Sequence, residues 1–213
     1  MPMGCLFDET PEGYLSEQDA KRVIAPYSEL LNEAWRDGWE DWLSFDAVKR
    51  SRLLPRTRAC SVNDFAVARA RQLFGDRPGV RTCDELGFFK LRIRSPEDEL
   101  VIVRLKRLGV DHLARNIKTK QQKDYYNHAP VPGIPLGATR LTVGYVLDAT
   151  QTRVESVVAS LQLGLRDLIY SFGLDAEPDI KGLPVPLPPD MPEVRPPVRL
   201  KPSKKSQESG KTA

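Results

Sequence analysis

FFKLRIRSPEDELVIVRLKRL, residues 88–108, predicts the centre of the fold. Successive side chains of a β-strand point to opposite faces of its sheet, and this stretch alternates apolar and basic residues on either side of a polar turn at 95–99. One face then carries Phe89, Leu91, Ile93, Val101, Val103 and Leu105. The other face carries Lys90, Arg92, Arg94, Arg104 and Lys106. The pattern predicts a β-hairpin with a core face and a basic face.

The basic face of this hairpin is our first candidate for a binding surface. Like charges placed side by side on a sheet repel one another, so we expect an anion opposite them, either the protein's own carboxylates or a partner's phosphates. The leading hypothesis is a non-enzymatic accessory or regulatory protein that binds a polyanion, DNA first of all. Lys118, Lys120 and Lys123 would extend the patch. Contacts with phosphates position a protein on DNA without reading its sequence.

The charge of the chain is unevenly distributed. Residues 1–48 contain eleven acidic and three basic side chains, a balance of −8, and residues 49–80 contain eight basic and two acidic ones, a balance of +6. The acidic segment could therefore neutralise the basic one. The stretch 46–58 has five cations in ten residues, and it is either an arm that contacts a nucleic-acid backbone or a solvated loop that lies on the acidic N-terminal helix. The sequence leaves both interpretations open.

All three tryptophans of the protein recur at helical spacing. Trp35, Trp39 and Trp42 follow Leu31 at intervals of four, four and three residues, which places them on one face of a helix. They are candidates for binding a partner, as a helix groove or a base-stacking platform. The interpretation that we favour is that the stripe packs on the apolar face of the hairpin.

The remaining periodicity completes an α+β fold, with N-terminal helices packed on a largely antiparallel sheet of about five strands. A helix begins at Ser16, where the sequence resembles a capping box, and Pro26 either interrupts it or begins the next helix at its first turn. Another helix spans 62–74, and Pro55 breaks any helix before it. Residues 128–137 are too rich in proline and glycine for a regular element. Further strands are expected at 80–83, 141–147, 154–163 and 168–174, with a loose arm at 1–15, one domain at 16–175 and a disordered Pro/Lys-rich tail at 176–213.

Most enzyme classes lack their signature here. The three cysteines are far apart, and the two histidines, His112 and His128, do not have zinc-helix spacing. No glycine-rich phosphate loop is found, and the acids of the hairpin turn lack the lysine that a metal-dependent nuclease needs. We expect no metal and no cofactor, and a cytoplasmic protein without a signal peptide or the roughly 20-residue apolar run of a membrane span. An enzyme would need an unrecognised site around Gln121, Gln122, Asp148 and His112.

Three segments carry a resemblance to a family of small uncharacterised bacterial proteins. They are Thr119-Lys-Gln-Gln122 followed by Tyr126, the segment 132–135, and Leu141-Thr-Val-Gly-Tyr-Val-Leu-Asp148, and the resemblance covers about residues 50–175. Members occur beside helix-turn-helix regulators and zincin-like proteases in mobile-element, toxin–antitoxin or phage-defence settings. The resemblance implies a regulatory or defence role. It also supports a second hypothesis, a protein-interaction subunit of antitoxin or adaptor type that acts through the acidic N-terminal helix or the proline-rich tail.

Overall fold

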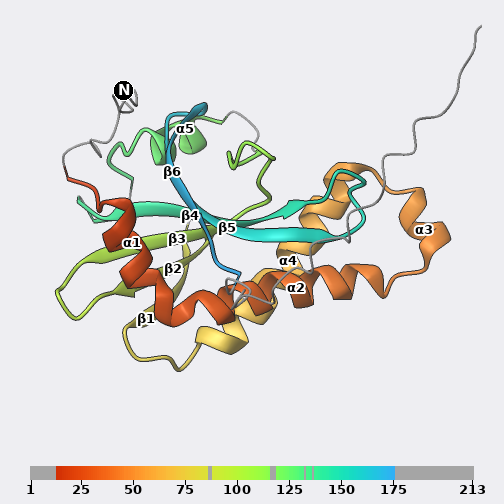
Figure 1. The fold of residues 1–213 in the computed structure, drawn as a ribbon, viewed down its shortest axis with the longest axis horizontal. Coiled ribbons are helices and arrows are strands. Elements are labelled where there is room, and N and C mark those ends of the chain that lie inside the picture. Colours follow the sequence, from red (N-terminus) through yellow and green to blue (C-terminus); the bar gives the residue numbers. More distant parts are fainter. Residues whose placement is uncertain (1–12, 86–87, 116–118, 132, 136, 176–213) are drawn as a thin grey trace, which may run out of the picture. The chain divides into compact units, whose positions relative to one another are not determined.

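The computed structural model describes residues 13–175 except 86–87, 116–118, 132 and 136. Within them, N-terminal helices pack on a six-stranded, mostly antiparallel sheet, which confirms the α+β prediction of a largely antiparallel sheet of about five strands (Figure 1). The helices are α1 (Glu17–Ile24), the 3-10 turn η1 (Ala25–Tyr27), α2 (Ser28–Leu43), α3 (Ala47–Ser51), α4 (Pro55–Phe74) and α5 (Lys120–Tyr126). The strands are β1 (Val80–Glu85), β2 (Phe88–Arg94), β3 (Leu100–Leu105), β4 (Thr139–Leu147), β5 (Val154–Leu163) and β6 (Asp167–Gly173).

The sheet follows the chain in order, from β1 to β6. The predicted hairpin is confirmed: β2 and β3 pair antiparallel, with Leu91 opposite Val103 and Ile93 opposite Val101. The exception to antiparallel pairing is β3 with β4, which run parallel. A parallel pair needs a crossover connection, and here residues 106–138 supply it, with α5 on the face of the sheet opposite α2 and α4 (Figure 1).

The N-terminal helices begin and end for local reasons. The Ser16 hydroxyl accepts a hydrogen bond from the Asp19 N–H and caps α1, as the sequence predicted. No helix runs through Pro55, as predicted, but the sequence analysis missed that this proline begins α4. Proline is well suited to the first helical position, where its fixed φ already matches the helix and its missing N–H would have had no partner. The helix predicted at 62–74 is therefore longer at its start.

The apolar face of the hairpin lies in the main core. Leu91, Ile93, Val101 and Val103 are fully buried there with residues of α1, α2 and α4. The two longest helices cross closely at Gly38, where a Cβ atom would lie 2.8 Å from the Ala66 nitrogen. This close crossing allows α2 and α4 to cover the sheet as one layer. The predicted tail 176–213 and residues 1–12 of the predicted arm lie outside the described residues.

Candidate polyanion interface

The basic face of the hairpin lies beneath the crossover. Lys90 and Arg104 are only 3% and 2% exposed, so neither side chain is presented at the surface to the backbone of a nucleic acid. The Arg104 guanidinium lies 4.4 Å from the ring centre of Phe88 and 4.5 Å from that of Tyr125. Its Nη1 donates to Gln122 Oε1 at 3.3 Å. Arg104 therefore acts as an interior cation between two aromatic rings.

Other cations of the same face bind the crossover backbone. Arg92 Nη2 donates to the Gly133 carbonyl oxygen. Arg140, a buried residue of β4, donates to the carbonyl oxygens of Tyr125 at 3.1 Å and Ala129 at 2.9 Å. The anion that the sequence led us to expect is thus partly replaced by neutral carbonyl acceptors. These hydrogen bonds fasten the irregular crossover to the sheet.

The remaining predicted phosphate contacts are scattered. Lys106 is half-buried, and burial lowers its pKa, with the charge of Arg104 adding to the effect. Arg94 is exposed and pairs with Asp98. Lys120 and Lys123 are exposed on α5, and Lys118 lies outside the described residues. The structure does not join these side chains to Lys90 and Arg104 in one exposed patch.

The tryptophan stripe belongs to the core. Trp35, Trp39 and Trp42 are 0%, 4% and 4% exposed, so α2 does not present them to a partner. The ring centre of Trp35 lies 4.9 Å from that of Tyr145 on β4, and that of Trp39 lies 6.1 Å from it. The stripe therefore packs on the sheet, although on β4 instead of the hairpin.

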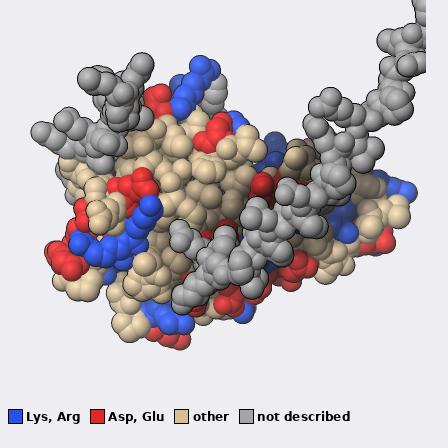
Figure 2. All heavy atoms as spheres, viewed as in Figure 1, with Lys and Arg blue, Asp and Glu red and all other residues tan. Residues whose placement is uncertain are grey.

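A different basic surface is formed by residues 45–58, which we call the cationic arm. It comprises the residues just before α3, all of α3, the connection from α3 to α4, and the first turn of α4. Its five cations are Lys49, Arg50, Arg52, Arg56 and Arg58. Lys49, Arg52 and Arg56 are exposed, and the other two are half-buried. Figure 2 shows blue and tan atoms together at the α3 end, with red atoms beside them.

Within the part of the chain that the structure describes, no carboxylate lies within the 4.0 Å ion-pair distance of any arm cation. Several cations of α1, α2 and α4 differ in this respect, whereas Lys120 and Lys123 of α5 also lack an ion pair among the described residues. The pairs are Lys21–Glu17 at 2.5 Å, Arg22–Asp19 at 3.2 Å, Arg36–Asp175 at 2.6 Å, Arg69–Glu33 at 2.5 Å, Arg69–Asp37 at 2.9 Å and Arg71–Asp84 at 2.7 Å. Glu33 and Asp37 of α2 thus pair with Arg69 of α4, beyond the arm, and the interpretation of 46–58 as a loop lying on the acidic helix is not supported.

The cationic arm also exposes apolar side chains. Phe45, Val48, Leu53 and Leu54 are 43%, 58%, 42% and 70% exposed, and they are four of the six large apolar side chains exposed among the described residues. A groove of about 480 Å³ runs beside them. Its lining includes Trp39, Trp42, Leu43, Ala47, Arg50, Ser51, Leu53, Pro55, Arg58, Gln151 and Thr152. Clustered exposed apolar residues are typical of interaction surfaces.

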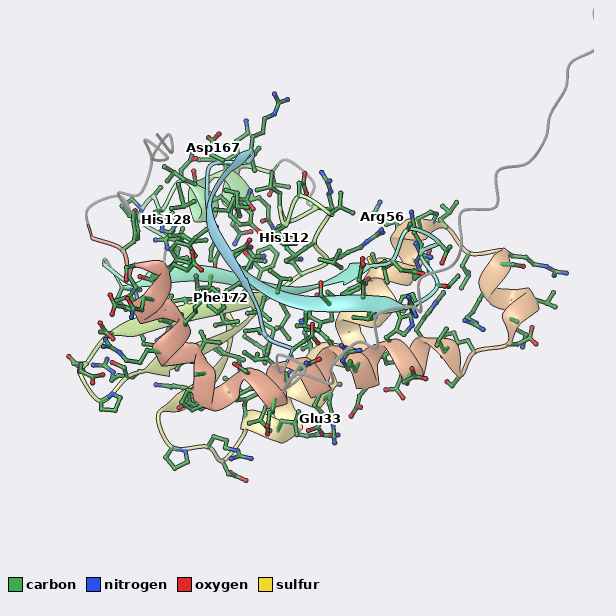
Figure 3. The ribbon with its side chains drawn as sticks, viewed as in Figure 1. Glu33, Arg56, His112, His128, Asp167 and Phe172 are labelled. Atoms are coloured by element: carbon green, nitrogen blue, oxygen red, sulfur yellow. The ribbon has the colours of Figure 1, made fainter. Side chains whose placement is uncertain are left out.

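The residues of the enzyme hypothesis contact different partners. His112 Nδ1 lies 2.8 Å from Ser171 Oγ, and Gln122 binds Arg104. Asp148 lies in the β4–β5 turn, where the hydrogen bond from the Thr150 hydroxyl lowers its pKa to about 2. Figure 3 places His112 and His128 on the crossover side, apart from Arg56 near the start of α4. Among the described residues, no three His, Cys, Asp or Glu side chains are grouped as metal ligands.

Comparison of the chain with protein-family models, curated proteins and solved structures finds no match. The resemblance to a bacterial family therefore stays a prediction. In the residues that the structure describes, no helix combines the length and the apolar character needed to cross a membrane. The physical arrangement of the domain alone supports the proposal that follows.

Proposed function

We propose that the chain binds a polyanion, in the first place the backbone of a nucleic acid, through the cationic arm and not through the hairpin face. One observation carries the proposal: five cations lie within ten residues, and none has a carboxylate partner among the described residues. Unpaired surface cations that meet phosphates release condensed counterions, and this release drives binding. We retain the regulatory or defence setting as part of the proposal, on the resemblance alone.

The expected electrostatic effect can be stated for the three exposed cations. Each phosphate that is neutralised adds about 0.9 to the slope of log affinity against log salt on duplex DNA. If Lys49, Arg52 and Arg56 each contact one phosphate, these three contacts make the affinity fall about 40-fold when the salt concentration rises from about 50 to 200 mM. Such contacts act on any sequence, because phosphates carry no base information.

The test compares two variants with the same change in charge. In the first, Lys49, Arg52 and Arg56 are replaced by Glu; in the second, Lys120, Lys123 and Arg166 are replaced by Glu. All six side chains are exposed, and none forms an ion pair within the described residues. Fluorescence anisotropy with a labelled duplex and a labelled single strand at about 50 mM salt measures the affinity of each.

We expect the arm variant to lose most of its affinity for both probes and the α5-side variant to lose much less. Equal losses would mean that net charge, and not the cationic arm, determines binding. Full binding by the arm variant would refute the proposal. The second variant also tests the sequence prediction that Lys120 and Lys123 contact phosphates.

A protein partner is the second candidate function, because of the exposed apolar side chains on the cationic arm. Leu53 and Leu54 are 42% and 70% exposed, and apolar anchors of this kind contribute to protein interfaces. Replacing both by Ser removes these anchors and keeps every arm cation. Loss of a co-purifying protein in this variant, with nucleic-acid affinity unchanged, would favour an adaptor or antitoxin-like role.

A further inference from the structure

A second group of cations, the half-buried Arg58 and Arg107, lies near Tyr145. Arg58 belongs to α4, Arg107 follows β3, and Tyr145 lies on β4 among the core residues that face the helices. The Tyr145 side chain is fully buried, with its ring centre 4.9 Å from that of Trp35 and 6.1 Å from that of Trp39. Segments that are distant in sequence thus contribute polar groups to one interior region.

Several buried polar atoms of this region have no hydrogen-bond partner among the described residues. Tyr145 Oη, Arg58 Nε and Arg107 Nε are buried, and each lacks a hydrogen-bond partner. The same is true of the indole nitrogens of Trp35 and Trp39, which lie beside Tyr145. Guanidinium and indole N–H groups can only donate, and a phenol hydroxyl can donate as well. Buried donors are almost always paired in folded proteins, so this concentration of unpaired donors indicates a ligand that accepts.

The charges of the region also favour an anion. No carboxylate of the described residues lies within 4.0 Å of Arg58 or Arg107. Burial lowers the pKa of Arg58, and the charge of Arg107 lowers it further, so the two guanidinium groups are close enough to repel each other. Burial raises the pKa of Tyr145 to about 12, so its hydroxyl keeps the proton at neutral pH and can donate it in a hydrogen bond.

The groove beside the cationic arm borders this region, since Trp39 and Arg58 both line it. Arg58 is held in place there: its Nη2 donates to Gln151 Oε1 at 2.6 Å and its Nη1 to the Gln151 carbonyl oxygen at 3.3 Å. Each terminal nitrogen donates one of its two N–H groups to Gln151, so Nε–H and one N–H on each terminal nitrogen remain for a ligand.

We propose that Arg58, Arg107 and Tyr145 bind one oxyanion of the phosphate type, which enters through the groove. A tetrahedral phosphate accepts hydrogen bonds from several directions, and guanidinium groups match its oxygen atoms in geometry and charge. The site shares Arg58 with the cationic arm but does not use Lys49, Arg52 or Arg56, so a variant at those three positions tests the two proposals separately. Two sources share this chemistry, namely free inorganic phosphate and the terminal phosphate of a nucleotide chain.

The test follows thermal unfolding of the full chain with inorganic phosphate against chloride at equal ionic strength. We expect phosphate to raise the unfolding midpoint of the wild type. Tyr145→Phe keeps the ring and its packing and should need about tenfold more phosphate for the same rise, because a hydrogen bond to a charged group is lost. Arg107→Met should abolish the rise. Tyr170→Phe is the matched control, since the Tyr170 hydroxyl already donates to the Leu15 carbonyl oxygen at 3.1 Å, and it should respond as the wild type does.

The proposal is overturned if phosphate acts no differently from chloride, or if Tyr145→Phe responds like the wild type. Should Arg107→Met fail to fold, Tyr145→Phe still decides the question. A 5′-phosphorylated dinucleotide and its 5′-hydroxyl counterpart distinguish the sources: competition by the phosphorylated one alone assigns the site to a nucleotide end, and competition by neither assigns it to free phosphate. The variant with Glu at 49, 52 and 56 should keep the phosphate response, so failure of the nucleic-acid proposal leaves this one standing.

Discussion

Gly38→Ala tests how the helical layer is built. Gly38 is buried on α2 between Trp35 and Trp39, at the crossing with α4. A Cβ atom there would lie 2.8 Å from the Ala66 nitrogen and 3.1 Å from both its Cα and its Cβ. Two of these three atoms belong to the backbone of a long helix, which cannot rotate away as a side chain can. The substitution must therefore push α2 and α4 apart.

The expected change is the sum of two opposed effects. Alanine is the better helix former by about 1 kcal/mol, which alone would stabilise the protein. Overpacking a tight contact costs about 1–3 kcal/mol, and contact with backbone atoms places this site at the upper end. We therefore expect the free energy of unfolding to fall by about 1–2 kcal/mol. Without the close crossing, the sign would be reversed.

Urea denaturation followed by tryptophan fluorescence measures this change, because all three tryptophans lie on α2 and are buried. Gly173→Ala is the control, since a Cβ at that strand position has no heavy atom within 4 Å, and it should change stability by about 0.5 kcal/mol at most. A Gly38→Ala protein that is as stable as the wild type, or more stable, would refute the crossing of α2 and α4 at this residue.

Two further predictions concern the crossover side. Arg104→Ala should lower stability by about 2–4 kcal/mol, because it removes a cation from between Phe88 and Tyr125 and leaves a cavity. The DNA affinity of this variant should stay the same. Lost affinity with unchanged stability would instead identify Arg104 as a phosphate contact. Burial, with the charge of Arg140 adding to it, lowers the pKa of His128 to about 4 from the ordinary 6.5. As the pH falls from about 6.5 to 4, the unfolded chain takes up this proton first, so stability decreases. Urea unfolding midpoints at pH 7 and pH 5 measure this loss of stability, and the difference between them should be smaller in His128→Gln than in the wild type. An equal difference in the two proteins would contradict the lowered pKa of His128.

The sequence predicted the elements that have a clear period. The two-residue alternation of the hairpin gave its strands and both faces, and the spacing of Trp35, Trp39 and Trp42 gave α2. The start of α4 at Pro55 was missed because proline is compatible with the first position of a helix as well as with its end. Sequence periodicity thus predicts which side chains share one face of a strand or helix, but it does not predict which segment of the chain packs over that face.

The cover of the basic face could not be read from the sequence. Residues 106–138 have little periodicity, and only the parallel pairing of β3 with β4 carries them over Lys90 and Arg104. The five cations of the cationic arm were visible as a charge run, but the pairing of the α2 acids with Arg69 became apparent only in the fold. The region around Arg107 and Tyr145 had no sequence signal, since its groups come from separate elements.

The salt dependence of duplex affinity is the most direct test of the cationic arm. Anisotropy titrations between about 50 and 200 mM salt give the slope of log affinity against log salt for the wild type and for the variant with Glu at 49, 52 and 56. If the three side chains contact phosphates, the variant's slope is smaller by about 2.7, which corresponds to three contacts. An equal slope in the two proteins would contradict the central claim that the cationic arm binds the phosphate backbone.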